Sequence, residues 1–368
     1  MEKPRILILG KLPPPYIGPA LATQIILSSD LQKSYELQHF DTALNKSVSD
    51  FGKVRIGKLA DLQGKYKAYR KVLKAYQPDL VLIPIGQTSA GFFKDVPFIR
   101  LAALSKAKTL LHLRGSAFKT WYEGLDVFRK KVVAKSVSRA DGAIVLGENL
   151  RSMFDDFFRP KNIHVVPNGA DYSFPERNSA HLQITYIANY LPGKGLKELL
   201  QALKGLKDRT DLPEFKFKAF GAWDSEEYRR ECTELANDLP FVELHDSISG
   251  DAKWQELSNT DIFVFTPKHP EGHPWSIVEA IAAGVPVVST NRGAISQSVK
   301  NGENGFLLND PVPGEIEEKL ATLLTDENLR TEMGGESRSL YERKFTAAAM
   351  VSNLDRSFKA TLDLCVES

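Results

Sequence analysis

The sequence of 368 residues is poor in the features that define several large classes of protein. Its two cysteines, Cys232 and Cys365, lie far apart and without the spacing of metal ligands, so neither a disulfide framework nor a zinc site is expected. No apolar run approaches the roughly 18 residues that a membrane-spanning helix needs. The short apolar run near Met1 suits a first β-strand and is too short for a signal peptide. These absences predict a cytoplasmic protein.

Low-complexity tracts and compositional extremes are also absent. Hydrophobic residues make up 42% of the chain and charged residues 26%, which are ordinary values for a globular protein. Disorder and fibrous repeats are therefore excluded. A chain of this length exceeds the usual size of one hydrophobic core, so two domains are expected.

Charge is distributed unevenly along the chain, although the net charge is only +2. Residues 1–165 contain 27 lysines and arginines against 14 acidic residues, and the remainder contains 21 against 32. Such an excess of positive charge is typical of a surface that contacts a polyanion. No nucleic-acid recognition motif or aromatic stacking platform accompanies it, so nucleic acid is not the expected partner. An anionic membrane surface, a lipid-linked phosphate or an acidic glycan is favoured.

Two helix-like segments carry much of this positive charge. In residues 125–137 the apolar positions 125, 128, 132, 133 and 137 share one face, which is compatible with a helix at a membrane interface. The alternative is that both segments are ordinary surface helices with solvated charged faces. The basic residues are Lys65, Lys67, Arg70, Lys71 and Lys74 in the first segment, and Arg129, Lys130, Lys131, Lys135 and Arg139 in the second.

Strand-like and helix-like segments alternate through both halves of the chain, which predicts an α/β fold with doubly wound parallel sheets. The tail, residues 345–366, is predicted to form one helix because Met350, Leu354, Phe358 and Leu362 recur at four-residue spacing. The predicted strands are 5–9, 37–40, 80–85, 109–113, 142–146 and 164–167 in the first half, and 183–188, 215–220, 242–245, 262–266 and 285–289 in the second.

The segment from Glu271 to Glu279 contains two carboxylates with seven residues between them. Prolines and a glycine before Ser276 forbid regular structure, and helix-forming residues follow, so a helix is predicted to begin near Ser276. Glu271 then lies in a loop and Glu279 in the first helical turn. The N-terminus of such a helix has unpaired N–H groups and can bind a phosphate. Alternatively, Ser276 and Glu279 form a capping box that serves only the helix itself.

This segment resembles the E-x7-E motif of the retaining glycosyltransferases of family four. The sequence Ala-Ala-Gly-Val-Pro-Val-Val typically follows that motif, and residues 282–288 have it here. Val-Pro-Asn-Gly-Ala at 166–170 and the Lys194-Gly195 pair agree with the same family in order and spacing. The resemblance is strong over residues 165–310 and loose over the first half of the chain.

The resemblance implies a GT-B fold, in which two Rossmann-like domains face a central cleft. Residues 1–167 would form the acceptor-binding domain, and residues 345–368 would cross back to it. Residues 168–344 would form the domain that binds the nucleotide sugar.

The same resemblance implies roles for residues of the second half. Glu279 would accept hydrogen bonds from the ribose hydroxyls of the donor, and Glu271 would bind the sugar and favour positive charge at its anomeric carbon. Lys194 would stabilise the leaving diphosphate. The segment before and at the helix start would assist Lys194 with its backbone N–H groups. This segment contains Gly272, His273, Pro274, Trp275 and Ser276.

Further donor-site positions also depend on the resemblance. Asn189 stands where the family usually has an arginine, and His273 either contacts the sugar or is packed structurally. Gly18, in a loop stiffened by prolines, would let the backbone approach the sugar phosphate, or would only form a tight turn. The family usually has a histidine near the end of the fourth strand. Here His112 and Arg114 lie on the same side of that strand, so the pair takes over this role, unless His112 is only packed there.

Together these features predict a retaining, metal-independent hexosyltransferase, cytoplasmic or peripheral at the inner face of a membrane. It would move a sugar from a UDP-, GDP- or ADP-sugar to a glycan or lipid-linked acceptor, in surface polysaccharide or glycolipid synthesis. No Asp-x-Asp pair is evident, so neither a metal nor another cofactor is expected. The alternatives are a nucleotide-sugar epimerase of the same fold and a non-catalytic protein that binds a nucleotide sugar or a glycan.

Overall fold

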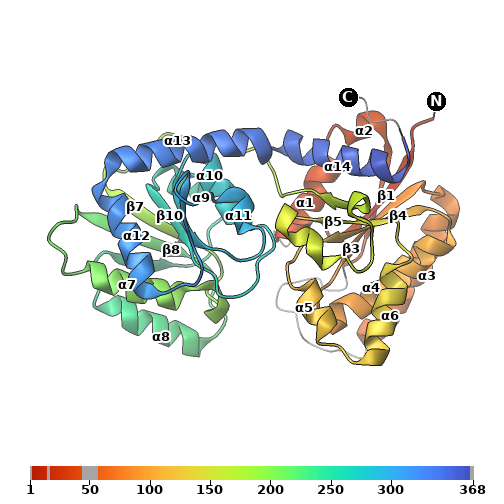
Figure 1. Cartoon of the computed structure of the whole chain (residues 1–368), viewed down its shortest axis with the longest axis horizontal. Helices are drawn as coiled ribbons and strands as arrows, with labels where there is room; N and C mark the ends of the chain where they lie inside the picture. Colours follow the sequence, from red (N-terminus) through yellow and green to blue (C-terminus); the bar gives the residue numbers. More distant parts are fainter. Residues whose placement is uncertain (1, 15–16, 44–56, 365–368) are drawn as a thin grey trace. The chain divides into compact units, whose positions relative to one another are not determined.

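The chain is divided into two compact units. The computed structural model describes residues 2–14, 17–43 and 57–364. Unit 1 comprises Met1–Ala170 together with Ala347–Ser368, and unit 2 comprises Asp171–Thr346. Figure 1 shows the elements of both units along the chain. In the part of the chain that the structure describes, no helix is both long and apolar enough to cross a membrane.

Unit 1 contains a six-stranded parallel sheet with the order β2-β1-β3-β4-β5-β6. Its inner strands are apolar runs buried on both faces, as a sheet covered by helices on both sides requires. The strand order reverses between β1 and β3, and ligands of open α/β sheets bind at the carboxyl ends of strands at such a point. The strands are β1 (Arg5–Gly10), β2 (Glu36–Asp41), β3 (Leu80–Ile85), β4 (Lys108–Leu113), β5 (Gly142–Val145) and β6 (Ile163–Val165).

Helices connect the strands of unit 1 and cover its sheet. Three of them form a layer, because α4 contacts both α3 and α6 (Figure 1). The helices are α1 (Gly18–Leu27), α2 (Leu31–Ser34), α3 (Gly57–Tyr76), α4 (Ser89–Leu104), α5 (Phe118–Glu123), α6 (Val127–Val137) and α14 (Ala347–Thr361), with the 3-10 helices η2 (Glu148–Met153) and η3 (Pro160–Asn162).

The C-terminal helix α14 packs on unit 1. The hydroxyl of Tyr35 donates a hydrogen bond to Asp355 Oδ1 at 2.7 Å, and its ring meets Phe358 edge to face at 5.7 Å between centroids. The predicted single helix over 345–366 is wrong at its start, because the preceding helix is capped at Phe345 and α14 begins at Ala347. The prediction is also wrong at its end, because α14 ends at Thr361 and residues 362–364 are not helical, while Cys365 and Val366 lie outside the described residues.

Unit 2 contains a second six-stranded parallel sheet, with the order β12-β11-β10-β7-β8-β9. Here the strand order reverses between β7 and β10, which places a second switch point at the carboxyl ends of these strands. The strands are β7 (Leu182–Ile187), β8 (Phe215–Phe220), β9 (Val242–His245), β10 (Ile262–Phe265), β11 (Val287–Thr290) and β12 (Gly305–Leu308).

The helices of unit 2 alternate with its strands, as the doubly wound prediction requires. The α/β fold class predicted from the sequence is confirmed, and each of the eleven predicted strands is present. The strand β12 was not predicted. The helices are α7 (Leu196–Leu206), α8 (Glu226–Asn237), α9 (Gly250–Ser258), α10 (Trp275–Ala282), α11 (Ile295–Ser298), α12 (Pro313–Thr325) and α13 (Glu327–Lys344), with the 3-10 helix η4 (Pro192–Lys194).

Candidate functional site

The loops after β7 and β10 bring Lys194 and Glu271 together. The two strands are neighbours and run parallel, so their following loops emerge at the same edge of the sheet. Lys194 Nζ lies 2.6 Å from Glu271 Oε1, and both side chains are partly buried. A cation and a carboxylate therefore meet at the switch point of unit 2, where sequence analysis predicted both. The ion pair fixes the position of both side chains.

The position of Lys194 depends on the glycine that follows it. Gly195 has a φ of +83°, a conformation that side-chain-bearing residues rarely adopt. A Cβ at this position would lie 1.9 Å from the carbonyl oxygen of Thr266 at the end of β10. Only glycine fits there. A hydrogen bond of 2.9 Å from the Lys268 N–H to the Gly193 carbonyl also joins the loop after β10 to the loop after β7.

The helix α10 begins one residue earlier than predicted. Pro274 is its N-cap and Trp275 its first residue, so Ser276 lies inside the helix. The capping-box interpretation is therefore wrong, since no side chain caps this helix start. Glu279 is the fifth helical residue, which also corrects its predicted place in the first turn. The N–H groups of Trp275 and Ser276 belong to that first turn and have no intrahelical acceptor, whereas Pro274 has no N–H.

The carboxylate of Glu279 is held by a lysine that sequence analysis did not identify. Lys253 on α9 forms an ion pair with Glu279, and the side chains are only 16% and 4% exposed. The Lys253 ammonium also lies 5.4 Å from the centroid of the Trp254 ring. A buried carboxylate needs such a partner, because desolvation of an isolated charge is costly. The two residues are 26 positions apart in the sequence, and no local pattern connects them.

His273 is packed into unit 2. Its Nε2 and the Ser298 hydroxyl share a hydrogen bond of 2.6 Å, and its ring lies 5.1 Å from that of Phe345. Burial lowers the pKa of His273 to about 3, so the imidazole is neutral at physiological pH. This geometry favours the packing interpretation over a contact with the sugar. The neighbouring Gly272 is fixed by its carbonyl, which accepts a hydrogen bond from the Ala294 N–H at 2.8 Å.

Two other predicted donor-site residues lie close to the end of a strand or at the start of a helix. Asn189 is exposed two residues after β7, in the loop that carries Lys194. Gly18 is the first residue of α1 in unit 1, and the two residues before Ile17 lie outside the described part of the chain. Among the residues that the structure describes, no group of three histidine, cysteine or carboxylate side chains is placed to hold a metal ion.

His112 and Arg114 lie close together at the carboxyl end of β4 in unit 1. Burial, and then the charge of Arg114, lowers the pKa of His112 well below its ordinary value, so His112 is neutral. Its Nε2 is buried and has no hydrogen-bond partner among the described residues. Burial lowers the pKa of Arg114 to about 10, and its guanidinium donates to Asn168 Oδ1 at 3.1 Å. Unit 1 thus has a cation and an unpaired imidazole at the end of one strand.

Most of unit 2 matches a known protein family. The family described as Glycosyl transferases group 1 matches residues 173–340. Residues 173–340 are thus similar to this family. The matched segment spans nearly all of unit 2 and contains Lys194, Lys253, Glu271 and Glu279.

Two curated relatives of the chain are glycosyltransferases by name. It is 26% identical over 219 residues to the uncharacterized glycosyltransferase MJ1178 of Methanocaldococcus jannaschii, covering 59% of this chain and 57% of that protein. It is 30% identical over 180 residues to the capsular polysaccharide biosynthesis glycosyltransferase CapM of Staphylococcus aureus, covering 49% of this chain and 46% of CapM. The chain therefore spans about half the length of these relatives.

A solved structure is similar over almost the whole chain. Anabaena Alr3699/HepE, in complex with UDP and glucose, matches with a TM-score of 0.72 and 17% sequence identity, covering 97% of this chain and 99% of that one. At this identity the likeness concerns the fold. Together with the two parallel sheets, it confirms the GT-B fold of two Rossmann-like domains.

Proposed function

We propose that the protein is a retaining glycosyltransferase that moves a sugar from a nucleotide-diphosphate sugar to a glycan or lipid-linked acceptor. The observation that carries this proposal is the Lys194–Glu271 pair at the switch point of unit 2, in the segment that matches the Glycosyl transferases group 1 family. The glycosyltransferase relatives and the similar fold of a protein solved with UDP and glucose support it. The name of CapM supports a role in surface polysaccharide or glycolipid synthesis.

The donor is proposed to bind by separating the ion pair. The diphosphate, with more negative charge than one carboxylate, takes Lys194 and the N–H groups of Trp275 and Ser276. Glu271 is then free to accept hydrogen bonds from sugar hydroxyls and to face the anomeric carbon. Glu279, held by Lys253, accepts hydrogen bonds from the ribose. The base of the nucleotide is a uridine, guanosine or adenosine.

The proposed chemistry breaks the bond between the anomeric carbon and the diphosphate oxygen. The electron pair of that bond leaves with the diphosphate, and Lys194 and the α10 N-terminus stabilise the new charge, as preorganised donors do in catalysis generally. The acceptor hydroxyl then forms the new bond on the same face of the sugar, and its proton passes to the leaving phosphate. The positive charges named here belong to the protein, so we propose a metal-independent reaction.

The acceptor is proposed to bind to unit 1, where His112 and Arg114 lie at the carboxyl end of β4. The neutral His112 can offer or accept one hydrogen bond at Nε2, and Arg114 remains a cation at physiological pH. A phosphorylated or acidic acceptor would suit Arg114. We also propose that the protein works at the inner face of a membrane, because unit 1 carries the excess of positive charge.

Nucleotides are expected to stabilise the protein selectively. A nucleoside diphosphate at a hundred times its Kd adds about 2.7 kcal/mol to the free energy of unfolding. For a unit of this size that raises Tm by about 5–10 °C. The measurement is thermal unfolding with UDP, GDP, ADP and their sugars, first with a chelator and then with added Mg²⁺. We expect one base to give this shift under both conditions.

Other outcomes of the same panel would replace the proposal. A folded protein that responds to no nucleotide has no donor site, and its role is then to bind a glycan. A shift that requires Mg²⁺ contradicts metal independence. Conversion of the sugar to its epimer without acceptor, followed by NMR, identifies an epimerase.

A further inference from the structure

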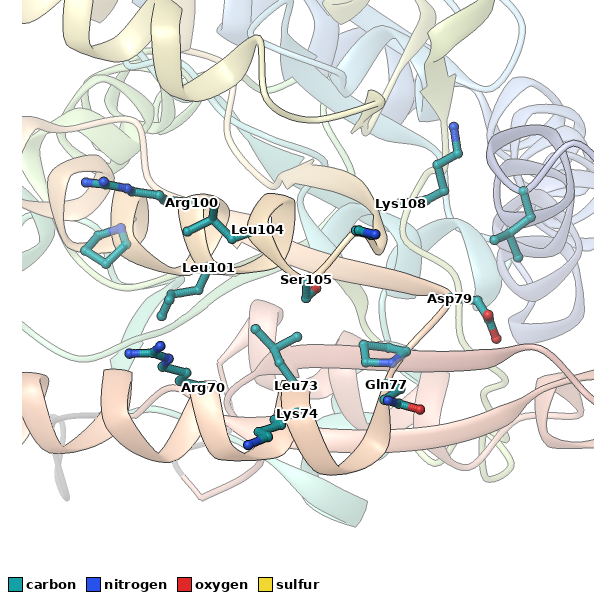
Figure 2. Close-up of a pocket in the computed structure, with 14 residues that line it drawn as sticks. Arg70, Leu73, Lys74, Gln77, Asp79, Arg100, Leu101, Leu104, Ser105 and Lys108 are labelled. Carbon is teal, nitrogen blue, oxygen red and sulfur yellow. The ribbon is translucent and has the colours of Figure 1, made fainter.

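A groove runs between α3 and α4 of unit 1 (Figure 2), and the residues of the proposed reaction are not among those that line it. It has a volume of about 990 Å³. Asp79 and Lys108 line one end of it, and they stand directly before β3 and at the start of β4. The groove therefore opens at the amino ends of the strands, whereas His112 and Arg114 lie at the carboxyl end of β4.

The side chains at the rim of this groove are mostly cationic. Arg70 and Lys74 come from α3, Arg100 comes from α4, and Lys106 follows α4. All four are exposed, and none forms an ion pair with another described residue.

Lys108, the fifth lysine or arginine of the groove, is neutralised by Asp141 at 3.1 Å. Asp79, the carboxylate that lines the groove, accepts a hydrogen bond from the Arg5 N–H at 2.7 Å. The net charge of the side chains that line the groove is therefore positive, and a bound anion would neutralise part of it.

Helix ends explain only part of this charge. Cations near a helix C-terminus offset the partial negative charge there, but that effect is confined to the last turn. Lys74 and Lys106 are placed for it, at the ends of α3 and α4. Arg70 lies six residues before the end of α3, and Figure 2 shows it at the same end of the groove as Arg100 on the facing helix. This pair of arginines on two helices is suited to a shared anionic group.

The groove also has an apolar part. Leu73, Pro97 and Leu101 line it, and Leu104 at its side is 71% exposed. A large exposed leucine next to unpaired cations suits a ligand that is anionic at one end and apolar at the other. A phosphate with an attached hydrocarbon chain has this chemistry.

We propose that the groove between α3 and α4 binds the phosphate headgroup of acidic phospholipids and docks unit 1 on an anionic membrane surface. The planar guanidinium groups of Arg70 and Arg100 pair with phosphate oxygens in a forked geometry. Lys74 and Lys106 add electrostatic attraction, and Leu104 enters the interfacial region of the bilayer. This docking site is independent of the donor site in unit 2.

The test is co-sedimentation with vesicles of phosphatidylcholine, with and without phosphatidylglycerol. Binding is expected only with phosphatidylglycerol and should weaken as salt rises. Each cation at an anionic surface contributes about fivefold, so Arg70→Glu/Arg100→Glu should lower affinity by at least about 25-fold. The matched control is Lys130→Glu/Lys131→Glu on α6, which changes the net charge equally and should lower affinity by less than about threefold. Leu104→Ser should weaken binding without any change of charge.

Three results would overturn the groove as the docking site. Equal loss in both double variants means that the whole positive face attracts the membrane. Loss in the α6 variant alone moves the contact to α6, whose Phe128 is 75% exposed beside Lys130 and Lys131. Inhibition by soluble glycerol phosphate at low concentration, with no effect of Leu104→Ser, means that the groove takes a free phosphate. Circular dichroism verifies the fold of each variant, and the nucleotide-induced Tm shift reports the donor site separately.

Discussion

Replacing Glu271 with alanine is expected to lower sugar transfer by about 10²–10³-fold, which is the usual effect of removing one preorganised electrostatic group. The variant loses the carboxylate that we propose to face the anomeric carbon. It also frees Lys194, whose ammonium lies 2.6 Å from Glu271. Affinity for the nucleoside diphosphate should therefore stay unchanged or rise while kcat falls. The measurements are release of nucleoside diphosphate from the donor sugar and nucleotide binding by calorimetry.

A second ion pair of the same kind provides the control for this result. Lys197 and Glu231 also lie 2.7 Å apart in unit 2, but both side chains are well exposed on α7 and α8. Exposed pairs contribute little to stability, so Glu231→Ala should leave both activity and nucleotide affinity unchanged. Full activity of Glu271→Ala would make Glu271 an ordinary loop residue. A fall in nucleotide affinity equal to the fall in kcat would assign it to binding alone.

Replacing Lys253 with alanine is expected to cost about 3 kcal/mol of stability, because it leaves the buried Glu279 carboxylate without a partner. For a unit of this size the loss corresponds to a fall in Tm of about 6–12 °C. Nucleotide affinity should fall as well, since Glu279 then turns away from the ribose toward water. Chemical denaturation and calorimetry with the nucleotide that the thermal panel identifies measure both effects.

Two further variants separate stability from binding. Lys218 and Glu256 form another partly buried pair of unit 2, at 3.2 Å, so Lys218→Ala should lower Tm but leave nucleotide affinity unchanged. In the double variant Lys253→Met/Glu279→Leu the buried charges are replaced by apolar groups, which is often neutral or stabilising. It should regain stability and still bind nucleotide weakly. Normal nucleotide affinity in this double variant would remove Glu279 from the donor site.

The sequence predicted the strands well, for a physical reason. The central strands of a covered parallel sheet are short apolar runs, and β3 and β8 were predicted with the bounds that the structure has. The strand β12 was missed because Gly302 and Gly305, both at positive φ, are typical of a turn and leave only four residues for the strand. The tail helix was predicted too early, since the break at Phe345 has no glycine or proline to mark it.

The candidate site was predicted only in part. Lys194 and Glu271 follow strands, and the sequence identifies such positions. The partner of Glu279 depends on how α9 packs against α10, which no local pattern encodes. The predicted apolar face of α6 is buried only in part, because Val133 and Val137 are buried while Phe128 is exposed. Periodicity indicates a common face but does not say how far along the helix the neighbouring elements cover it.

The packing of α14 on the rest of unit 1 bears on the order in which the two units fold during synthesis. Unit 2 is continuous in sequence, so a growing chain can complete its core while synthesis continues. Unit 1 gains its last helix only at the end of synthesis, and Asp355 and Phe358 of that helix contact Tyr35 near the start of the chain. A nascent chain that stops before Ala347 therefore has a complete unit 2 and an incomplete unit 1. The unit made first is the one that folds last.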